Sequence, residues 1–285
     1  MNLRYTIRTL WASLISSLKM TIRYVTLQGL VTYNLAVPFF FILTSWIAAE
    51  IMKQSPGFNL DFFTSASGGM IDYLSFVIVG FSFQNIVFST VYGGGHAIRG
   101  EQEGGTAELV FVTPSNKVAW LLGKMLGNLI FSFIGFFAII LSGMFLFGFH
   151  PQASPNIPTA VLGVLLTMLA MTAFGFVFAG LCFVAKREEE VTQVFWTMMT
   201  FFCGFAFPVG ILPQWAQAIA WAIPLTHGID VTRKALLLGT AVTDITLLGQ
   251  LGILCIQIIV LLPIGALLFS KLEKAAKRTG ALGTY

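Results

Sequence analysis

Long runs of apolar residues are the feature of this sequence that most restricts its fold. Six of them, in the ranges 30–52, 71–94, 118–147, 158–185, 191–211 and 247–270, carry few charged side chains. A helix of about 20 mostly apolar residues crosses the hydrocarbon core of a bilayer. Charged residues make up only 10% of the chain, against about 25% in soluble domains. The sequence therefore predicts an all-α integral membrane protein with six transmembrane helices.

The positions of lysine and arginine predict how these spans are oriented, because loops that stay in the cytoplasm carry an excess of both residues. If the N-terminus is cytoplasmic, only Lys53, Arg233 and Lys234 of the 16 Lys and Arg residues fall on the outer side. We therefore expect both termini and the loops after the second and fourth spans to be cytoplasmic. The basic residues form no continuous patch, which argues against a nucleic-acid partner.

Residues 1–28 show a helical pattern with one polar and one apolar stripe. The polar stripe consists of Arg4, Arg8, Ala12, Ser16, Lys19 and Arg23, and the opposite stripe of Leu3, Ile7, Leu10, Leu14, Leu18, Ile22 and Val25. This spacing predicts an amphipathic helix that lies in the membrane interface, with its basic side toward lipid headgroups or a partner. We therefore divide the chain into an N-terminal segment, 1–28, and a membrane domain, 29–285.

An acidic segment, "RGEQEGGTAELVFVTPSNK", follows the second span in a chain that otherwise has little charge. Gly104 and Gly105 break any preceding helix, and Thr106 is a capping residue for a new one. Pro114 moves the residue before it out of helical conformation. The segment at about 101–114 therefore predicts a helix of about two turns, 107–112.

The chemistry of this short helix leaves two interpretations open. Glu101, Glu103 and Glu108 cluster at and before its N-terminus, where the helix dipole favours negative charge. The apolar run 109–112 has to bury at least one face against the protein, the bilayer or a partner. The segment is either a rigid lever for a soluble motor protein or an ordinary loop that lies on the membrane.

A second segment, 208–228, breaks the apolar pattern before the last span. Pro213 and Pro224 are the first and last of twelve residues, which span roughly 18 Å as a helix and are too short to cross a core of about 30 Å. We expect an interfacial or re-entrant helix on the outer side. Asp230 and Arg233, which follow it, have the spacing of a solvated ion pair. The alternative for Asp230 is a catalytic or metal site with His227.

These two segments resemble the two signatures of one family. "EQEGGTAELVFVTPSNK" resembles the coupling segment in the membrane subunit of type-2 ATP-binding-cassette (ABC) exporters, which handle drugs, lipids and lipo-oligosaccharides. "ILPQWAQAIAWAIPLTHGIDVTRKALLLG" is similar to the second signature, before the last span. The resemblance covers nearly the whole chain, in the expected order. Gln102 stands where the family commonly has a second arginine, which leaves the salt bridge at that spot unsupported.

The resemblance implies a permease in a bacterial cytoplasmic (inner) membrane, with a coupling helix that docks in a cleft of an ATPase. Two copies of a nucleotide-binding subunit would carry ATP and Mg, and a second permease, identical or homologous, would complete the unit. No lysine in this chain is followed by Ser or Thr, so the chain lacks a P-loop, and we expect no enzymatic activity and no bound cofactor of its own. The coupling residues carried over are Glu101, Glu103, Gly105, Thr106, Glu108, Leu109, Phe111, Thr113 and Pro114. Either Phe111→Ala or Ala107→Pro, intended to break the helix, is expected to abolish transport-linked ATPase stimulation.

The spans contain almost no ionisable residues, and the chain has 28 phenylalanines. An uncharged aromatic passage suits a hydrophobic or amphiphilic substrate such as a drug, a lipid or a glycolipid. A polysaccharide exporter is the alternative, because rings also stack on sugars. We expect Phe205 and Phe207, beside Pro208, to gate the outer end of the passage. The candidate path residues are Phe81, Gln84, Asn85, Thr197, Phe201, Phe205 and Phe207.

Three other kinds of site or protein have less support. A secondary transporter normally has charged residues within its spans. An integral-membrane enzyme needs polar catalytic groups at one depth, whereas the three histidines, His96, His150 and His227, fall in three different loops. Cys182, Cys203 and Cys255 lie singly, without the spacing of a zinc site or a disulfide framework.

Overall fold

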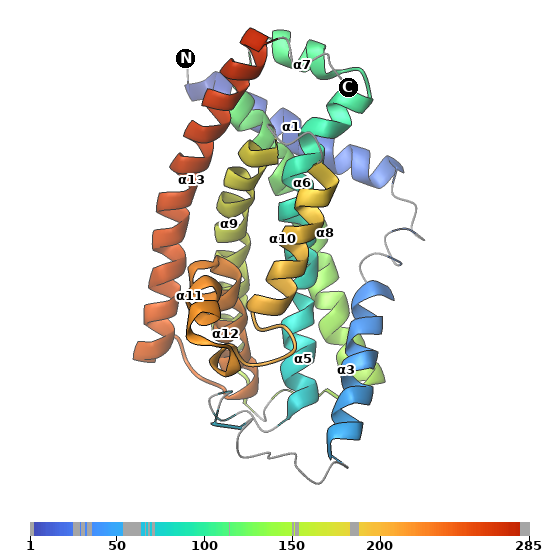
Figure 1. Cartoon of the computed structure of the whole chain (residues 1–285), viewed down its shortest axis with the longest axis vertical. Helices are drawn as coiled ribbons and strands as arrows, with labels where there is room; N and C mark the ends of the chain where they lie inside the picture. The colour runs from blue at the N-terminus through green and yellow to red at the C-terminus, as the bar shows by residue number, and fades with distance from the viewer. Residues whose placement is uncertain are drawn as a thin grey trace.

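The computed structural model describes residues 3–24, 29, 32, 36–53, 64–65, 67, 69, 72–113, 115–149, 151, 154–182 and 188–279. Its regular elements in these ranges are all helices. Long helices run side by side along one axis, and shorter helices cover both ends of the bundle (Figure 1). This arrangement agrees with the predicted all-α fold class.

Four stretches among the described residues are long and apolar enough to cross a membrane: Tyr73–Ala97, Lys117–Leu146, Ile157–Gly180 and Ile245–Ala275. The first is built from α5 (Tyr73–Ser82) and α6 (Gln84–Glu103), which meet at Phe83. The others belong to α8 (Lys117–Leu146), α9 (Ile157–Cys182) and α13 (Ile245–Thr279). The chain is therefore a multi-pass membrane protein.

The described residues of the first and fifth predicted spans form two further helices in the same bundle. These are α3 (Val37–Lys53), with 17 residues, and α10 (Glu188–Phe202), with 15 residues. Residues 54–63, which follow α3, and residues 183–187, which precede α10, lie outside the described ranges, so these counts refer to the described residues alone. Six membrane crossings therefore stay a prediction.

The helix of the fifth predicted span ends earlier than the range 191–211 implies. After Phe202, Gly204 takes a left-handed φ of 79°, a conformation that ends a helix and favours glycine. The residues up to 211 instead form a turn and a short 3-10 helix, η2 (Val209–Ile211). The apolar run continues past the helix because the turn itself packs inside the protein.

The N-terminal helix α1 (Leu3–Tyr24) lies across one end of the bundle, where α7 and the C-terminal end of α13 also lie (Figure 1). We call this the α7 end. Small residues let α1 approach α8: a Cβ at Gly123 would lie 2.1 Å from Ser13 Oγ, and one at Gly127 would lie 2.7 Å from Ser17 Cβ. Ser13 Oγ also donates a hydrogen bond of 2.6 Å to the Trp120 carbonyl. The two helices thus pack through small residues, as helices in membranes commonly do.

The described part of the predicted amphipathic segment keeps its four basic side chains exposed, at Arg4, Arg8, Lys19 and Arg23. Residues 25–28 of that segment lie outside the described ranges. The position of α1 relative to a membrane surface stays a prediction.

The opposite end of the bundle, which we call the α12 end, carries α11 (Gln214–Ala222) and α12 (Pro224–Leu237). Pro213 caps α11 and Pro224 begins α12, so the helix predicted between the two prolines is present. Trp215 is 64% exposed, whereas α12 packs on α9 and α13. The interfacial position of α11 stays a prediction.

Candidate functional site

The predicted coupling helix is α7 (Ala107–Val112), with the bounds expected from the sequence. The preceding helix α6 ends at Glu103, and Gly105 takes a φ of +66°, which only glycine adopts without strain. Thr113 has a ψ of 136° and is no longer helical. Pro114, which we expected to cause this change, lies outside the described residues.

Two expectations about the start of α7 are corrected by the structure. Thr106 occupies the cap position but makes no side-chain cap hydrogen bond. Its hydroxyl instead donates to the Glu101 carboxylate, which draws it away from α7. Ala107 is the first residue of the helix, where proline is tolerated. Ala107→Pro is therefore not the helix-breaking change that we expected. Val110→Pro is, because the Val110 N–H donates to the Thr106 carbonyl.

A salt bridge joins α6 to α8 beside the start of α7, where Glu101 also accepts a hydrogen bond from the Thr106 hydroxyl. Lys124, on α8, donates to the Glu101 carboxylate, and both side chains are largely buried, at 14% and 13% exposed. Burial alone raises the pKa of Glu101, but the hydrogen bonds from Lys124 and Thr106 and the Lys124 charge outweigh it, so the pKa lies below its usual value. The salt bridge of Glu101 lies one residue from Gln102, the position at which the family resemblance left a salt bridge unsupported.

The lowered pKa of Glu101 predicts a specific pH dependence of stability. Because the folded protein binds this proton less readily than the unfolded chain, the contribution is present above the ordinary pKa of 4.5 and is lost as the pH falls through the lower folded value. We expect the melting temperature of wild type to exceed that of Glu101→Gln near neutral pH, and the difference to vanish in acid. Thermal unfolding in detergent as a function of pH measures this. Glu189→Gln, at an exposed position, is the control, and a pH-independent difference for Glu101→Gln would contradict the assignment.

A buried lysine holds the other end of α7. Lys117 is 5% exposed, and its ammonium group donates to the carbonyls of Val110 and Thr113, the latter at 2.7 Å, and to Ser115 Oγ at 2.9 Å. As the first residue of α8, this cation faces an unfavourable helix dipole, whereas the C-terminal carbonyls of α7 stabilise it. Sequence reasoning missed Lys117 because its partners lie on the preceding helix.

Between these two attachments, α7 carries apolar side chains on its exposed side. Leu109 is 72% exposed and Val112 is 83% exposed, whereas Val110 packs against the cluster around Trp120 and Phe269. The side chains of Glu103, Glu108 and Phe111 lie outside the described part of the chain, so their predicted roles are not tested. The arrangement is a short helix fixed to α6 and α8 that exposes apolar surface at the end of the bundle (Figure 1).

Four of the predicted path residues lie inside the bundle. Phe81, Gln84 and Asn85 are buried on α5 and α6, and Phe205 is 1% exposed in the turn after α10. The ring centroids of Phe81 and Phe205 are 5.7 Å apart, and Phe41 of α3 stacks on Phe81 at 5.3 Å. The structure therefore brings the predicted gate residue Phe205 against the second span.

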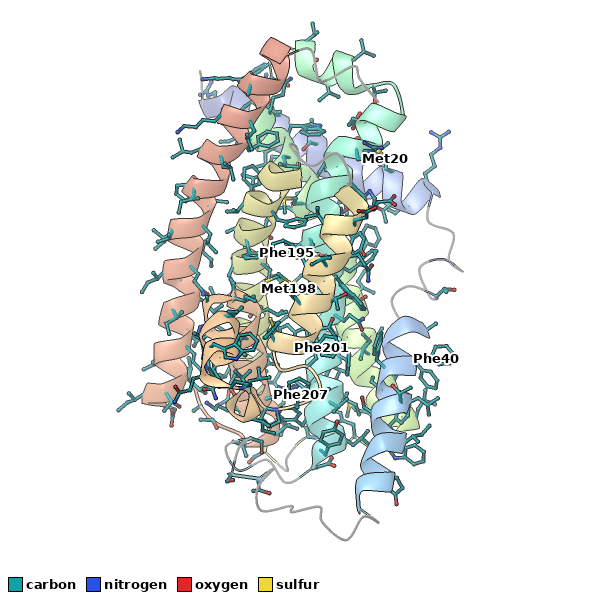
Figure 2. The ribbon with its side chains drawn as sticks, in the orientation of Figure 1. Met20, Phe40, Phe195, Met198, Phe201 and Phe207 are labelled. Atoms are coloured by element: carbon teal, nitrogen blue, oxygen red, sulfur yellow. The ribbon has the colours of Figure 1, made fainter. Side chains whose placement is uncertain are left out.

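The other three predicted path residues are less buried. Thr197 is half-buried on α10, and its hydroxyl donates to the Gln193 carbonyl at 2.8 Å. Phe201 is 59% exposed, and Phe207 is half-buried beyond the end of the helix (Figure 2). Phe201 shares an exposed apolar stripe with Val194 and Met198. The predicted path residues therefore divide into a buried group and a group that is half-buried or exposed on α10 and in the turn after it.

The predicted solvated pair between Asp230 and Arg233 is wrong. Arg233 is 4% exposed, and its guanidinium donates to the carbonyls of Phe76, Gly204 and Phe205. Asp230 instead pairs with Lys234 at 2.7 Å and accepts a hydrogen bond from Gln250 on α13. The reason is tertiary: α12 packs into the bundle, so its residue 233 faces the interior.

The described residues contain no group of three or more His, Cys, Asp or Glu side chains that would hold a metal ion. His227 Nε2 lies 2.9 Å from the Trp221 carbonyl, and its ring packs against the Trp221 ring. The structure thus gives His227 a place in the packing between α11 and α12.

Comparison with known proteins places these elements in a family. The family model described as "ABC-2 type transporter" matches residues 4–237. The daunorubicin resistance ABC transporter permease protein DrrB1 of Streptomyces coeruleorubidus is 29% identical over 60% of this chain and 59% of its own length. Nodulation protein J of Rhizobium leguminosarum bv. viciae is 34% identical over 33% of this chain and 38% of its own length. The probable multidrug ABC transporter permease YbhR of Escherichia coli K12 is 24% identical over 47% of this chain and 36% of its own length.

Each of these alignments spans less than two thirds of the relative. The family model, in contrast, covers most of this chain, from the start of α1 to the end of α12. The chain belongs to the ABC-2 type transporter family.

Proposed function

We propose that this chain is the permease subunit of an ABC exporter that moves a hydrophobic or amphiphilic substrate out of the cytoplasm or the inner leaflet. Its family membership and its relatives named for daunorubicin resistance and multidrug transport support this proposal. Hydrolysis of ATP, with Mg, takes place on a separate nucleotide-binding subunit in two copies. A second permease, identical or homologous, completes the complex.

In this proposal the α7 end faces the cytoplasm of a bacterial cell and the α12 end faces outward. The N-terminal helix, α7 and the C-terminal end of α13 share one end of the bundle, as an even number of crossings requires (Figure 1). The same end carries the basic side chains of α1 and the last turns of α13, in agreement with the excess of Lys and Arg on cytoplasmic sides. α3 and α10 then complete six crossings.

The coupling step follows from the attachment of α7. Leu109 and Val112 dock in a cleft of the ATPase and leave water, which stabilises the contact. At the start of α7, the Thr106 N–H and hydroxyl donate to Glu101 of α6, and at its other end the Lys117 ammonium group of α8 binds the Thr113 carbonyl, so a movement of α7 reaches both helices. The Glu101–Lys124 salt bridge joins α6 to α8. When the ATPase displaces α7, α6 and α8 therefore move with it, and the movement reaches the membrane domain. The exposed apolar side of a firmly attached α7 is the observation that carries the proposal.

Transport in everted membrane vesicles tests the proposed function. Vesicles containing the chain and its ATP-binding subunit are expected to accumulate daunorubicin or a fluorescent phospholipid only with ATP and Mg. Vesicles that contain the chain alone are the control. Uptake of a labelled oligosaccharide in place of both probes would favour the polysaccharide alternative. Uptake driven by a proton gradient without the second subunit would contradict the proposal and indicate a secondary transporter.

A further inference from the structure

A buried arginine connects three segments near the α12 end, where the proposed passage closes. From α12, Arg233 Nε donates to the Phe76 carbonyl at 3.0 Å, Nη1 donates to Gly204 at 2.6 Å, and Nη2 donates to Phe205 at 2.8 Å. The guanidinium carbon also lies 3.4 Å from the centroid of the Phe76 ring. One side chain thus binds α5 and the turn after α10 at the same time.

The carbonyls in this turn need such a partner. Gly204 and Phe205 follow the last residue of α10, so their carbonyls have no place in its hydrogen-bond ladder. Away from water, unsatisfied backbone groups are costly. The planar guanidinium presents several donors in a fixed geometry, whereas a lysine ammonium is a point donor at the end of a flexible chain. The contact therefore depends on the shape of arginine as well as on its charge.

The backbone around this contact is shaped to admit it. A Cβ at Gly80 would lie 2.2 Å from the Phe205 carbonyl oxygen and 2.3 Å from Arg233 Nη2. Gly204 takes a left-handed φ of 79° in the same turn. Glycine at both positions lets α5 and the turn close on the guanidinium. The two glycines therefore fit this contact, and we expect the turn to move when the contact is lost.

We propose that Arg233 is a positioning residue that holds the turn at residues 203–205 against α5 and so keeps Phe205 packed on Phe81 at the closed outer end of the passage. Opening this end requires the turn to leave the guanidinium, because its backbone carbonyls and the Phe205 ring move together. This inference rests on the proposed function, since it concerns the gate of that transporter. The residue that holds the gate closed thus lies on α12 and is not one of the gate residues Phe205 and Phe207.

Cys203 provides a native reporter in the same turn. Its side chain is 1% exposed, so a thiol reagent reaches it only when the turn moves. In a background with Cys182→Ala and Cys255→Ala, the rate of Cys203 modification by N-ethylmaleimide is measured on the folded complex. We expect Arg233→Gln to raise this rate on the order of tenfold, because hydrogen bonds from a charged donor are lost. Basal ATP hydrolysis is expected to rise while its stimulation by daunorubicin falls.

The matched variants separate positioning from charge. Lys234→Gln removes the neighbouring cation, which pairs with Asp230, and is expected to leave the Cys203 rate unchanged. Arg233→Lys keeps the charge and is expected to behave like Arg233→Gln, because lysine cannot reproduce the three-donor contact. Gly80→Ala keeps the arginine but forces the Phe205 carbonyl and the guanidinium apart from the new Cβ, and is expected to raise the Cys203 rate as well. Restoration of the wild-type rate by Arg233→Lys would overturn the proposal in favour of a charge effect.

Three further outcomes would also count against the proposal or against the proposed function on which it rests. An unchanged Cys203 rate in folded Arg233→Gln overturns the proposal. Failure of Arg233→Gln, Arg233→Lys and Gly80→Ala all to give a monodisperse complex overturns it too, since the contact would then serve general folding. Because thiol modification requires neither transport nor ATP, a faster Cys203 reaction with no transport by the wild-type complex would refute the proposed exporter and leave Arg233 as the residue that holds the turn.

Discussion

Replacement of both Leu109 and Val112 by serine is expected to abolish transport-linked stimulation of ATP hydrolysis. Both side chains are mostly exposed in the isolated chain, at 72% and 83%. If docking buries them fully, each contributes about 1.5–3 kcal/mol. Together these values correspond to a docking affinity lower by about 10² to 10⁴-fold. The measurement is ATPase activity of the reconstituted complex with and without daunorubicin, together with copurification of the two subunits.

The matched control for this double variant is Ile245→Ser, at the first residue of α13. Ile245 is 86% exposed, but it lies at the α12 end of the bundle. We expect it to leave ATPase stimulation and copurification unchanged. Single changes among the acidic residues are expected to have smaller effects, because a partly exposed charge pair contributes only about 0.2–1 kcal/mol. A double variant that assembles and couples like wild type would remove α7 from the coupling mechanism.

Gly123→Val is expected to displace α1 from the bundle and to destabilise the protein strongly. A Cβ there would lie 2.1 Å from Ser13 Oγ and 2.5 Å from the Leu10 carbonyl oxygen. The second contact is with backbone, so a side-chain rotation cannot relieve it, and α1 has to move. Overpacking costs about 1–3 kcal/mol or more, and each kcal/mol lowers the melting temperature by roughly 2–4 °C for chains of 150–250 residues. Thermal unfolding in detergent and protease cleavage within residues 1–28 measure the two consequences.

Gly249→Val is the control for this change, because nothing lies within 4 Å of a Cβ at Gly249. It adds the same side chain to a long helix of the same bundle. We expect its melting temperature to stay close to that of wild type. Equal effects of the two variants would show that valine lowers stability through helix propensity alone and that the close packing of α1 on α8 is not important.

The parts of the site that were predicted correctly depend on local chemistry. The bounds of α7 follow from Gly104 and Gly105 before it and from the non-helical Thr113 after it, all within a few residues. The apolar runs likewise predict helices, because hydrophobicity over about 20 residues is a local property. Helix α11 was likewise predicted from a local feature, the prolines Pro213 and Pro224 at its two ends.

The parts that were missed depend on contacts between distant segments. Glu101 meets Lys124 only because α6 and α8 pack together. Arg233 is buried because α12 enters the bundle, whereas its spacing from Asp230 alone indicates a surface pair. Helix α10 ends at Phe202, before the turn that contains Gly204, although hydrophobicity continues to residue 211, because the turn is buried as well. In each case tertiary packing decides the outcome, and one sequence contains no direct signal of it.

Cross-linking from α7 tests the central claim, that a separate ATPase drives this chain through that helix. Val112→Cys places a reactive thiol at a position that is 83% exposed, and Ile245→Cys places one at the other end of the bundle. Both changes are made with Cys182, Cys203 and Cys255 replaced by alanine, and native membranes are treated with a thiol-to-amine cross-linker. We predict that Val112→Cys links to a polypeptide that contains a Gly-x-x-x-x-Gly-Lys-[Ser/Thr] P-loop, and that Ile245→Cys does not. A chain that hydrolyses ATP alone, or a Val112→Cys protein that forms no link to a P-loop subunit in membranes active in transport, would contradict the account.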